Sequence, residues 1–402
     1  MKKPEILAPA GNMEKLRIAV HYGADAVYLG GKSFGLRNLA GNFSNAELAE
    51  AVDYAHNRQV KVYLTVNAYP DNADLPLLGR FLEETAHVPF DACIAADPGV
   101  IRLLREITPA RDIHLSTQAN TTNWQSARFW EEQGIKRINL AREMSLEAMG
   151  EVRNQVGLEL EVFVHGAMCI SYSGRCLLSG IMAERSANRG ECAHPCRWSY
   201  ALVEEKRPGE YFPVTEDETG SFIFNSRDLC LLSYLPQLAE CGIDSFKIEG
   251  RMKGIHYLAS VVRVYREALD RYWDDPAAFS VKPEWLEELG KISHRGYTTG
   301  FILGRPADID REYHSRYTRS HDIVGIVEET LPDGRVIIGV RNRLETGDTV
   351  EFIGRHMAVN RLHLEEMTDE NGSFVQIANP NRRVSINVPF HTERFDIIRR
   401  EK

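Results

Sequence analysis

The sequence predicts an α/β protein: a (β/α)8 TIM-like barrel with a cysteine-rich insertion, followed by a small C-terminal β-barrel domain. Three observations predict this fold. Short aliphatic and β-branched runs alternate with amphipathic helical runs from residue 4 to about residue 275. Four cysteines crowd into a glycine-rich stretch from Cys169 to Cys196. From about His321 onward, short strands separated by turn signals replace the alternation.

Eight runs are typical of barrel strands. They are EILAPA (5–10), DAVYLG (25–30), KVYLTV (61–66), DACIAAD (91–97), IHLSTQ (113–118), RINLAR (137–142), LEVFVHG (160–166) and SFKIEG (245–250). A ninth run, FIFNS (222–226), either makes the barrel closure irregular or is a strand of the insertion. Helices are expected after capping residues, such as Ser44, Asn45 and Glu47 before AELAEAVDYAH.

The expected domain limits follow from these changes in pattern. Residues 1–275 are predicted to form the catalytic barrel, with the cysteine-rich insertion at 167–221, and residues 276–315 a helical connector. Residues 316–402 are predicted to form the small β-barrel, in which Asp333 and Gly334 turn a hairpin. Every Lys or Arg of this last domain except Lys402 is arginine, a bias that suits phosphate contacts and a role in RNA binding.

Composition limits the classes of function. A chain of 402 residues is long enough for two domains, and no run reaches membrane-spanning length or forms a signal peptide, so we expect a cytoplasmic protein without a membrane partner. The net charge of −9 argues against a protein that binds nucleic acid with its whole surface and leaves room for a local basic patch.

Polar residues stand where the predicted strands end. In a (β/α)8 barrel, the loops that follow the strands gather at one face and form the active site. The residues selected by this rule are Asn67, Asp97, Gln118, Asn120, Arg142, Glu143, His165, Glu249 and Arg251. Lys247 and Glu249 alternate with Phe246 and Ile248, so both should point to the same side of their strand.

The insertion follows one of these strand ends and carries Cys169, Cys176, Cys192 and Cys196. Four thiolates on a folded-back loop suit zinc or an iron–sulfur cluster, and the spacing does not decide between them. The close pair Cys192 and Cys196 fits structural zinc, whereas the pair Cys169 and Cys176 does not, and neither common ferredoxin spacing is present. An odd total of seven cysteines argues against a disulfide framework.

Several enzyme classes lack their motifs. The sequence contains no His-Glu-x-x-His helix, no Gly-x-Ser-x-Gly elbow and no Gly-x-Gly-x-x-Gly after the first strand. Zincin, serine hydrolase and dinucleotide-binding functions therefore have no support. A cysteine protease would need an activated thiol besides those expected to bind metal.

The string EVFVHGAMCISYSGRCLLSG resembles the signature of peptidase family U32, the collagenase-like peptidases. The resemblance covers nearly the whole chain and includes EILAPAGNMEKLRIAVHYGADAVYLGG, HLSTQAN, NRGECAHPCRW and SFKIEGRMK. Within the family, RPGEYF (207–212) and HRGYTTGF (294–301) are most similar to the branch that carries out prephenate-dependent 5-hydroxylation of tRNA uridine.

This resemblance implies that Cys169, Cys176, Cys192 and Cys196 bind a four-iron four-sulfur cluster, with zinc as the alternative. It implies an RNA-modifying enzyme that converts the wobble uridine of tRNA to 5-hydroxyuridine without molecular oxygen, with prephenate as co-substrate. The implied partners are tRNA, prephenate and a second, family-related subunit.

The remaining site residues then have expected roles. Arg142, Arg197, Lys247 and Arg251 would contact anions, because a cationic side chain binds carboxylate or phosphate. Asn67, Gln118 and Asn120 would contact a base edge, and His165 or Glu249 would transfer a proton. Two alternatives remain: a peptidase (hydrolase), as the family name states, and a non-catalytic, metal-stabilised tRNA-binding accessory protein.

Overall fold

A computed structural model of the chain describes residues 2–32, 34, 41–169, 171–197, 215–217, 220–222, 227–304 and 318–402. The chain divides into two compact units. The first contains Met1–Leu16, Asp25–Met252 and His294–Tyr317, and the second contains Arg17–Ala24, Lys253–Ser293 and Thr318–Lys402. The domain limits at residues 275 and 315 stay predictions. Within the described residues, none of the helices has the length and apolar character needed to cross a lipid bilayer.

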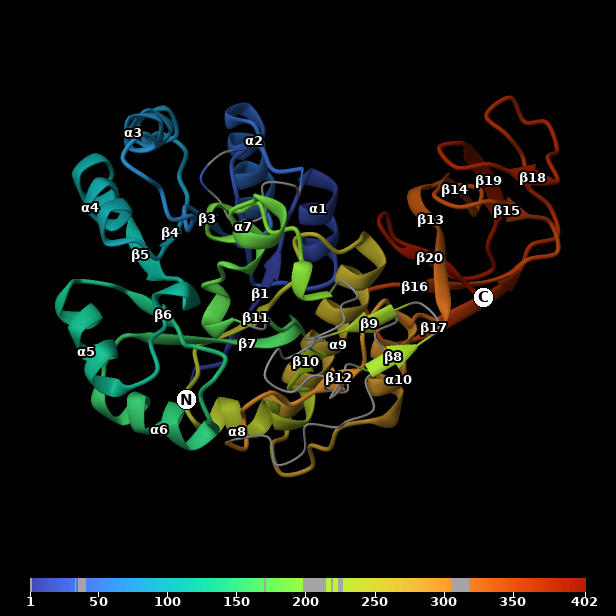
Figure 1. Ribbon diagram of the computed structural model, residues 1–402. Coiled ribbons are helices and arrows are strands. Elements are labelled where there is room, and N and C mark those ends of the chain that lie inside the picture. Colours follow the sequence, from blue (N-terminus) through green and yellow to red (C-terminus); the bar gives the residue numbers. More distant parts are fainter. Residues whose placement is uncertain are drawn as a thin grey trace, which may run out of the picture. The chain divides into compact units, whose positions relative to one another are not determined.

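Eight parallel strands close into a barrel in the first unit (Figure 1). They are β1 (Glu5–Pro9), β2 (Ala26–Leu29), β3 (Lys61–Thr65), β4 (Ala92–Ala95), β5 (Asp112–Leu115), β6 (Arg137–Asn139), β7 (Glu159–Ala167) and β11 (Ser245–Ile248). Each strand pairs in parallel with the next, and β11 closes the barrel by pairing with both β7 and β1. The predicted TIM-like barrel is confirmed, and each strand lies within or next to one of the eight predicted runs.

Helices alternate with these strands. They are α1 (Met13–His21), α2 (Asn45–His56), α3 (Leu75–Glu84), α4 (Pro98–Ile107), α5 (Trp124–Glu132), α6 (Leu146–Gln155) and α8 (Leu235–Glu240). The predicted cap of α2 is a complete capping box, in which Ser44 and Glu47 satisfy each other's backbone N–H groups. Asp97 caps α4 in the same way that Ser145 caps α6, by accepting a hydrogen bond from the first turn.

The insertion contains one short helix and three 3-10 turns among its described residues. They are η2 (Tyr172–Gly174), α7 (Leu178–Ala183), η3 (Ala187–Arg189) and η4 (Pro195–Arg197). A two-stranded hairpin follows, formed by β8 (Thr215–Asp217) and β9 (Gly220–Phe222). Only Phe222 of the predicted run 222–226 is in a described strand, and residues 223–226 lie outside the described residues.

Two short strands extend the sheet beyond the barrel. β10 (Asp228–Cys230) runs antiparallel to the last residues of β7, and β12 (Tyr297–Thr298) runs parallel to β10. Arg295 and Asp228 fasten this extension through a buried ion pair whose Nη2 and Oδ1 atoms are 2.6 Å apart.

The second unit contains the helices α9 (Ile255–Asp274) and α10 (Pro283–Lys291) and an antiparallel sheet that forms a half-barrel. In sheet order its strands are β17 (Val359–His363), β16 (Thr349–Ile353), β20 (Ile397–Glu401), β13 (His321–Thr330), β14 (Arg335–Val340) and β19 (Arg383–Asn387), and β15 (Leu344–Glu345) pairs separately with β18 (Ile377–Ala378). The predicted turn at Asp333 and Gly334 joins β13 to β14.

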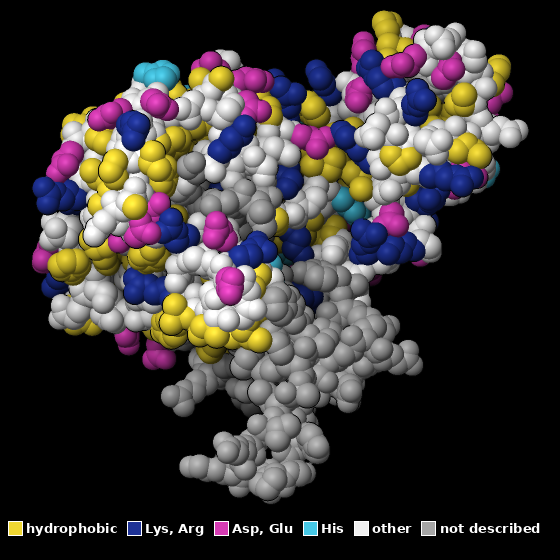
Figure 2. Space-filling view, turned by 45° about the horizontal axis from the view of Figure 1, so that its top comes forward, with side chains coloured by type: hydrophobic (Ala, Val, Ile, Leu, Met, Phe, Trp, Pro, Cys, Tyr) yellow, Lys and Arg dark blue, Asp and Glu magenta, His cyan; other side chains and the backbone are white. Residues whose placement is uncertain are grey.

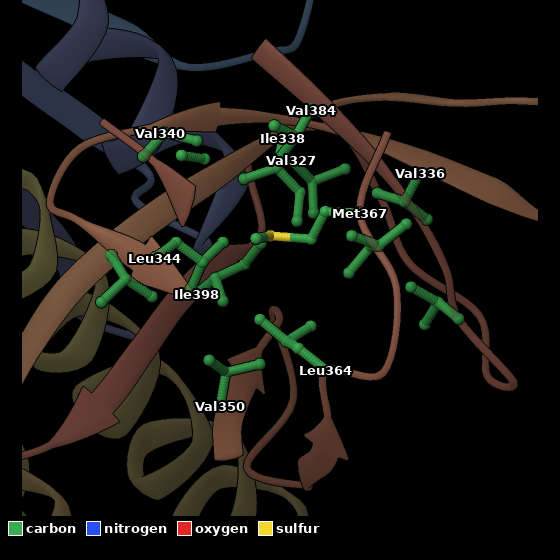
Figure 3. Close-up of a cluster of buried hydrophobic side chains, with 14 of the residues drawn as sticks. Val327, Val336, Ile338, Val340, Leu344, Val350, Leu364, Met367, Val384 and Ile398 are labelled. Carbon is green, nitrogen blue, oxygen red and sulfur yellow. The ribbon is translucent and has the colours of Figure 1, made fainter. Parts of the chain in front are cut away.

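Alternation along these strands builds the hydrophobic core of the half-barrel (Figure 3). Val336 and Ile338 of β14 and Val350 and Phe352 of β16 are at most 2% exposed, because every second side chain of a strand points to the same face. Met367 lies in the same cluster and fills it from a segment between β17 and β18.

A buried ionic group lies beside this core, in the same unit. Arg399 of β20 donates to both carboxylate oxygens of Glu288 and also pairs with Glu351 at 2.9 Å. Arg263 of α9 forms a second ion pair with Glu288 at 3.0 Å. The two arginines therefore neutralise two carboxylates that have been removed from water.

Candidate functional site

A cavity opens where the barrel strands end. Its walls combine the ends of the barrel strands with the cysteine-rich insertion. The sequence predicted that the strand-end residues and the cysteines would share one opening of the barrel. The predicted site residues that line it are Asn67, Gln118, Arg142, Cys169, Cys176, Cys192, Cys196, Lys247, Glu249 and Arg251. Lys247 and Glu249 do point to the same side, since both line this cavity.

Asn120 and His165 are not among its lining. Asn120 ends the 3-10 turn η1 (Thr117–Ala119) in a left-handed conformation with φ of 55°. His165 is 1% exposed, and its ring packs against Tyr297 of β12 with ring centroids 5.3 Å apart. The side chain of Arg197 lies outside the described residues.

The other strand-end residues have structural partners. Asp97 accepts a hydrogen bond from the Val100 N–H at the start of α4. Glu143 accepts two hydrogen bonds from Ser173, one from its N–H at 2.7 Å and one from its hydroxyl at 2.6 Å. Glu143 thereby fixes the insertion between Cys169 and Cys176.

Further contacts hold the insertion over the barrel. Arg175 donates through Nε to the backbone carbonyl of Gln118 at 2.8 Å. The Asn188 side chain accepts from the Cys176 N–H at 3.1 Å, while its backbone carbonyl accepts from the Tyr69 N–H at 3.0 Å. The insertion is therefore bonded to the loops that follow β3 and β5.

Among the four cysteines of the insertion, Cys169 is exposed and the other three are partly buried. Within the described part of the chain, no three His, Cys, Asp or Glu side chains form a group that could hold a metal ion. A zinc ion needs its thiolates within about 2.3 Å of one point, whereas the thiolates of a four-iron cluster surround a larger centre. Four thiolates are a donor set that suits either group.

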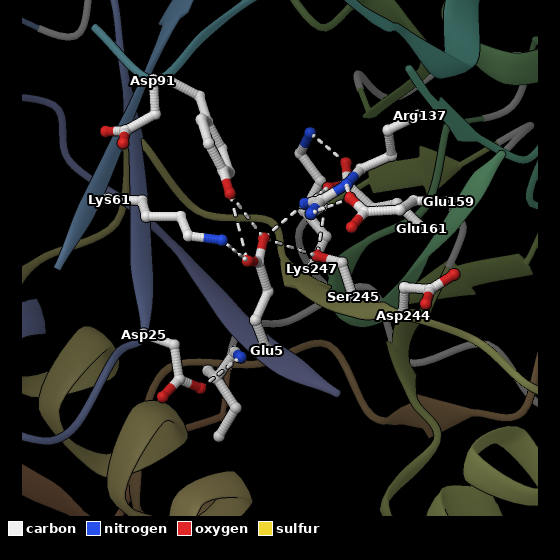
Figure 4. Close-up of polar contacts among 12 residues, drawn as sticks. Glu5, Asp25, Lys61, Asp91, Arg137, Glu159, Glu161, Asp244, Ser245 and Lys247 are labelled. Atoms are coloured by element: carbon white, nitrogen blue, oxygen red, sulfur yellow. Dashed lines mark hydrogen bonds and ion pairs between the residues drawn. The ribbon is translucent and has the colours of Figure 1, made fainter. Parts of the chain in front are cut away.

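The interior of the barrel has an apolar side and an ionic side. Leu7, Ala26, Tyr28, Tyr63, Ala92 and Ile94 form the apolar side. On the ionic side, Arg137 pairs with Glu159 at 2.6 Å and also with Glu5 and Glu161 (Figure 4). This network was not predicted from the sequence, although Arg137, Glu159 and Glu161 alternate with apolar residues along their strands.

Lys247 connects the ionic side to the cavity. Its Nζ is 2.7 Å from Glu161 Oε1 and 4.8 Å from the centroid of the Tyr28 ring. Burial acts to raise the pKa of Glu161, but the charges of Lys247 and Arg137 outweigh it and lower that pKa. Glu161 is therefore a carboxylate that holds the Lys247 side chain in place.

Two arginines add to the positive charge of the cavity. Arg142 stacks over Phe163, with its guanidinium carbon 3.8 Å from the ring centroid. Arg251 is 3% exposed and donates to Thr65 Oγ1 at 3.2 Å. Glu249, which also lines the cavity, accepts a hydrogen bond from the Tyr28 hydroxyl at 3.3 Å. Three cations and one carboxylate thus face a cavity that suits a small anionic ligand.

Sequence profiles of known families match almost the whole chain. The profile of peptidase family U32 matches residues 11–312, and that of the peptidase family U32 C-terminal domain matches residues 319–399. The chain is 42% identical to tRNA hydroxylation protein P1 of Bacillus subtilis over 380 residues, which is 94% of this chain and 90% of that protein. It is 37% identical to tRNA hydroxylation protein P of Escherichia coli over 420 residues, covering 94% and 92% of the two chains.

A third relative acts on a different RNA. It is the 23S rRNA 5-hydroxycytidine C2501 synthase of Escherichia coli, which is 32% identical over 374 residues, or 91% of this chain and 55% of that enzyme.

Proposed function

The chain belongs to peptidase family U32, and from this premise we propose that it acts in RNA hydroxylation, as an enzyme that converts the wobble uridine of tRNA to 5-hydroxyuridine. The observation that carries the proposal is that four cysteines, three cations and amide side chains line one cavity at the active face of the barrel. The names of its relatives, which hydroxylate tRNA or ribosomal RNA, support the same reaction class. We place the reaction in the cytoplasm.

In this proposal Cys169, Cys176, Cys192 and Cys196 hold a four-iron four-sulfur cluster. When bound, the cluster would supply electron transfer or a Lewis acid beside the cavity. The role of the protein is to hold the thiolates around one opening, which it does through the contacts of Glu143, Arg175 and Asn188.

The co-substrate in this proposal is prephenate, a dicarboxylate. Arg142, Lys247 and Arg251 are the described cations of the cavity, and their charges would bind two carboxylates. Lys247 and Arg251 are both buried, so their charges interact strongly with an anion that enters the cavity. The predicted contact from Arg197 remains part of the proposal.

Glu249 is the favoured proton carrier of the two that were predicted, because it lines the cavity and its carboxylate accepts from Tyr28. His165 is also at the end of β7, but its ring contacts Tyr297.

For tRNA itself, we propose contacts with the arginines of the C-terminal sheet. Many of them stand beside acidic residues, as the mixed dark-blue and magenta surface of Figure 2 shows and as the pairs Arg335–Asp333 and Arg383–Glu328 illustrate. Arg355 and Arg382 are exposed, and no ion pair to either is described. These two are the best candidates for phosphate contacts. A second, family-related subunit remains a further proposed partner.

The proposal is tested by nucleoside mass spectrometry of tRNA and of ribosomal RNA from a strain that lacks this chain. We expect 5-hydroxyuridine to disappear from tRNA and to return when the chain is supplied. Loss of a hydroxylated nucleoside from ribosomal RNA alone would instead indicate the substrate class of the third relative. Unchanged nucleosides in both RNAs would contradict the proposal and favour the accessory or peptidase function.

A further inference from the structure

Two buried amide groups in the cavity have a polar atom for which the described residues provide no hydrogen-bond partner. They are Nε2 of Gln118 and Oδ1 of Asn139, and both side chains are 2% exposed and line the cavity. Buried polar groups are normally satisfied, so an unmatched donor and an unmatched acceptor in one cavity indicate a ligand that supplies both partners.

The orientation of the Gln118 amide is set by its neighbours. Ser116 Oγ accepts from Asn67 Nδ2 at 3.5 Å and donates to Gln118 Oε1 at 3.1 Å. Because Oε1 accepts this hydrogen bond, Nε2 is the end of the amide that remains to donate. Gln118 therefore presents a donor.

The orientation of Asn139 is set even more firmly. Its Nδ2 donates to Glu161 Oε1 at 2.9 Å, and the same carboxylate accepts from Lys247 and from Ser245. An ionised carboxylate only accepts, so the amide cannot be reversed without placing oxygen against oxygen. Asn139 therefore presents Oδ1, an acceptor.

The two groups lie at different depths. Gln118 follows the end of β5 at the level of the insertion, since Arg175 bonds to its carbonyl and Gly174 packs beside its side chain. Asn139 belongs to β6 itself and stands opposite Glu161 in the strand register, within the ionic side of the barrel interior. The donor is thus near the cysteine-bearing loop and the acceptor is deeper.

The geometry points to a uracil ring, read by Gln118 and Asn139, with its C5 edge toward the cysteines. In uracil the oxygen O4 is next to C5 and accepts a hydrogen bond, and N3–H follows it and donates. Gln118 Nε2 donates to O4, and Asn139 Oδ1 accepts from N3–H. Cytosine presents the opposite order, an amino donor next to C5 and then an acceptor nitrogen, so the same pair disfavours it.

This assignment rests on the proposed function and adds the base-specificity determinants of the site. A site whose buried polar groups match one base leaves those groups unpaired when another base enters, and this mismatch weakens binding. Extraction of the target base into a pocket and recognition of its pairing edge are the general strategy of enzymes that modify bases.

The experiment uses the full chain, expressed in a strain that lacks it. Gln118→Met and Asn139→Leu keep side-chain size and remove the two hydrogen bonds. We expect each to lower 5-hydroxyuridine in tRNA at least about tenfold, while the affinity of the purified chain for tRNA changes less than about twofold because phosphate contacts dominate it. Gln133→Met, at an exposed glutamine directly after α5, is the matched control and should restore the nucleoside fully.

A second arm does not depend on the folding of a variant. The wild-type chain is supplied with a tRNA whose target uridine is replaced by cytidine, and we expect no hydroxycytidine at that position. If this cytidine is hydroxylated as well as uridine, or if Gln118→Met and Asn139→Leu both retain full activity, the inference is overturned while the proposed function stands. If the wild-type chain restores no hydroxylated uridine, the proposed function fails, and the base assignment fails with it.

Discussion

Lys247 Nζ lies 2.7 Å from Glu161 Oε1 inside the barrel, and both side chains are at most 5% exposed. This ion pair joins the ionic side of the barrel interior to the cavity, so one contact serves both stability and the proposed site.

We expect Lys247→Met to lower the free energy of unfolding of the barrel unit by about 3 kcal/mol. The substitution removes the ion pair with Lys247 and leaves the Glu161 carboxylate buried without it. Chemical denaturation monitored by circular dichroism measures the change. In the double variant Lys247→Met, Glu161→Gln the loss should be smaller than the sum of the two single losses by at least about 1 kcal/mol. Strict additivity would mean that the pair is not coupled.

The second unit should lose stability in mild acid through His256. Burial, with the charge of Arg399, lowers the pKa of His256 to about 3. The unfolded state, with an ordinary value near 6.5, then binds the proton first, so stability falls as the pH drops from about 6.5 toward 3. The expected slope is up to about 1.4 kcal/mol per pH unit.

Thermal melts between pH 6.5 and 5 measure this slope. The lowered pKa of the Glu288 carboxyl adds its own loss only below its usual value of 4.5, so it does not interfere in that interval. His256→Gln should make the dependence less steep, and the remaining slope is expected from His321 of the same unit, whose pKa burial also lowers. An equally steep slope in that variant would assign the effect to other groups.

The cysteines of the insertion should determine the iron content. Cys192→Ala is expected to reduce iron and acid-labile sulfide per chain to near zero after anaerobic purification. The matched control is Cys93→Ala, since Cys93 is buried in β4 and burial raises its pKa to about 11, which makes it a poor metal ligand. Zinc without sulfide in the wild-type chain would contradict the cluster.

Glu143 should act on the cluster through the loop that it holds. Glu143→Ala removes the acceptor of both Ser173 hydrogen bonds, and we expect the cluster to be lost to an iron chelator several times faster than in the wild type. The rate of bleaching of the cluster absorbance measures this. Glu147→Ala, at an exposed position in the first turn of α6, should leave the rate unchanged.

The exposed arginines Arg355 and Arg382, which lie in loops next to strands of the C-terminal sheet, should contribute to tRNA affinity through phosphates. The double variant Arg355→Glu, Arg382→Glu is expected to bind tRNA more weakly and with a shallower dependence on salt, because fewer counterions are released. Binding titrations at several salt concentrations give both quantities. The double variant Arg102→Glu, Arg105→Glu, at two exposed positions of α4, changes the net charge by the same amount and serves as the control. Equal affinity of the double variant and the wild type would place the RNA contacts elsewhere.

Much of the barrel could be predicted from the sequence because its strands are short, buried runs separated by amphipathic helices. The rule that active sites gather at strand ends found Asn67, Gln118, Arg142, Glu249 and Arg251, all of which line the cavity. It missed Asn139, which lies inside the predicted strand run 137–142 rather than after it. Alternation along that run would have placed Arg137 and Asn139 on the inner face together.

His165 shows what a single sequence does not reveal. The pairing of β7 with β11 shifts register, so that Lys247 stands opposite Phe163 and Ile248 opposite His165. Such an irregularity breaks the simple alternation of side chains, and it depends on contacts with a distant strand. The sequence also does not show which segments form the second unit. Tyr22, for example, donates a hydrogen bond to the carbonyl of Ile353, 331 positions away.

Tyr22 also accepts a hydrogen bond from the Ile397 N–H, and β20 is an inner strand of the half-barrel. During synthesis, Tyr22 leaves the ribosome 375 residues before its partner Ile397. The second unit cannot complete its fold before this strand has left the ribosome as well.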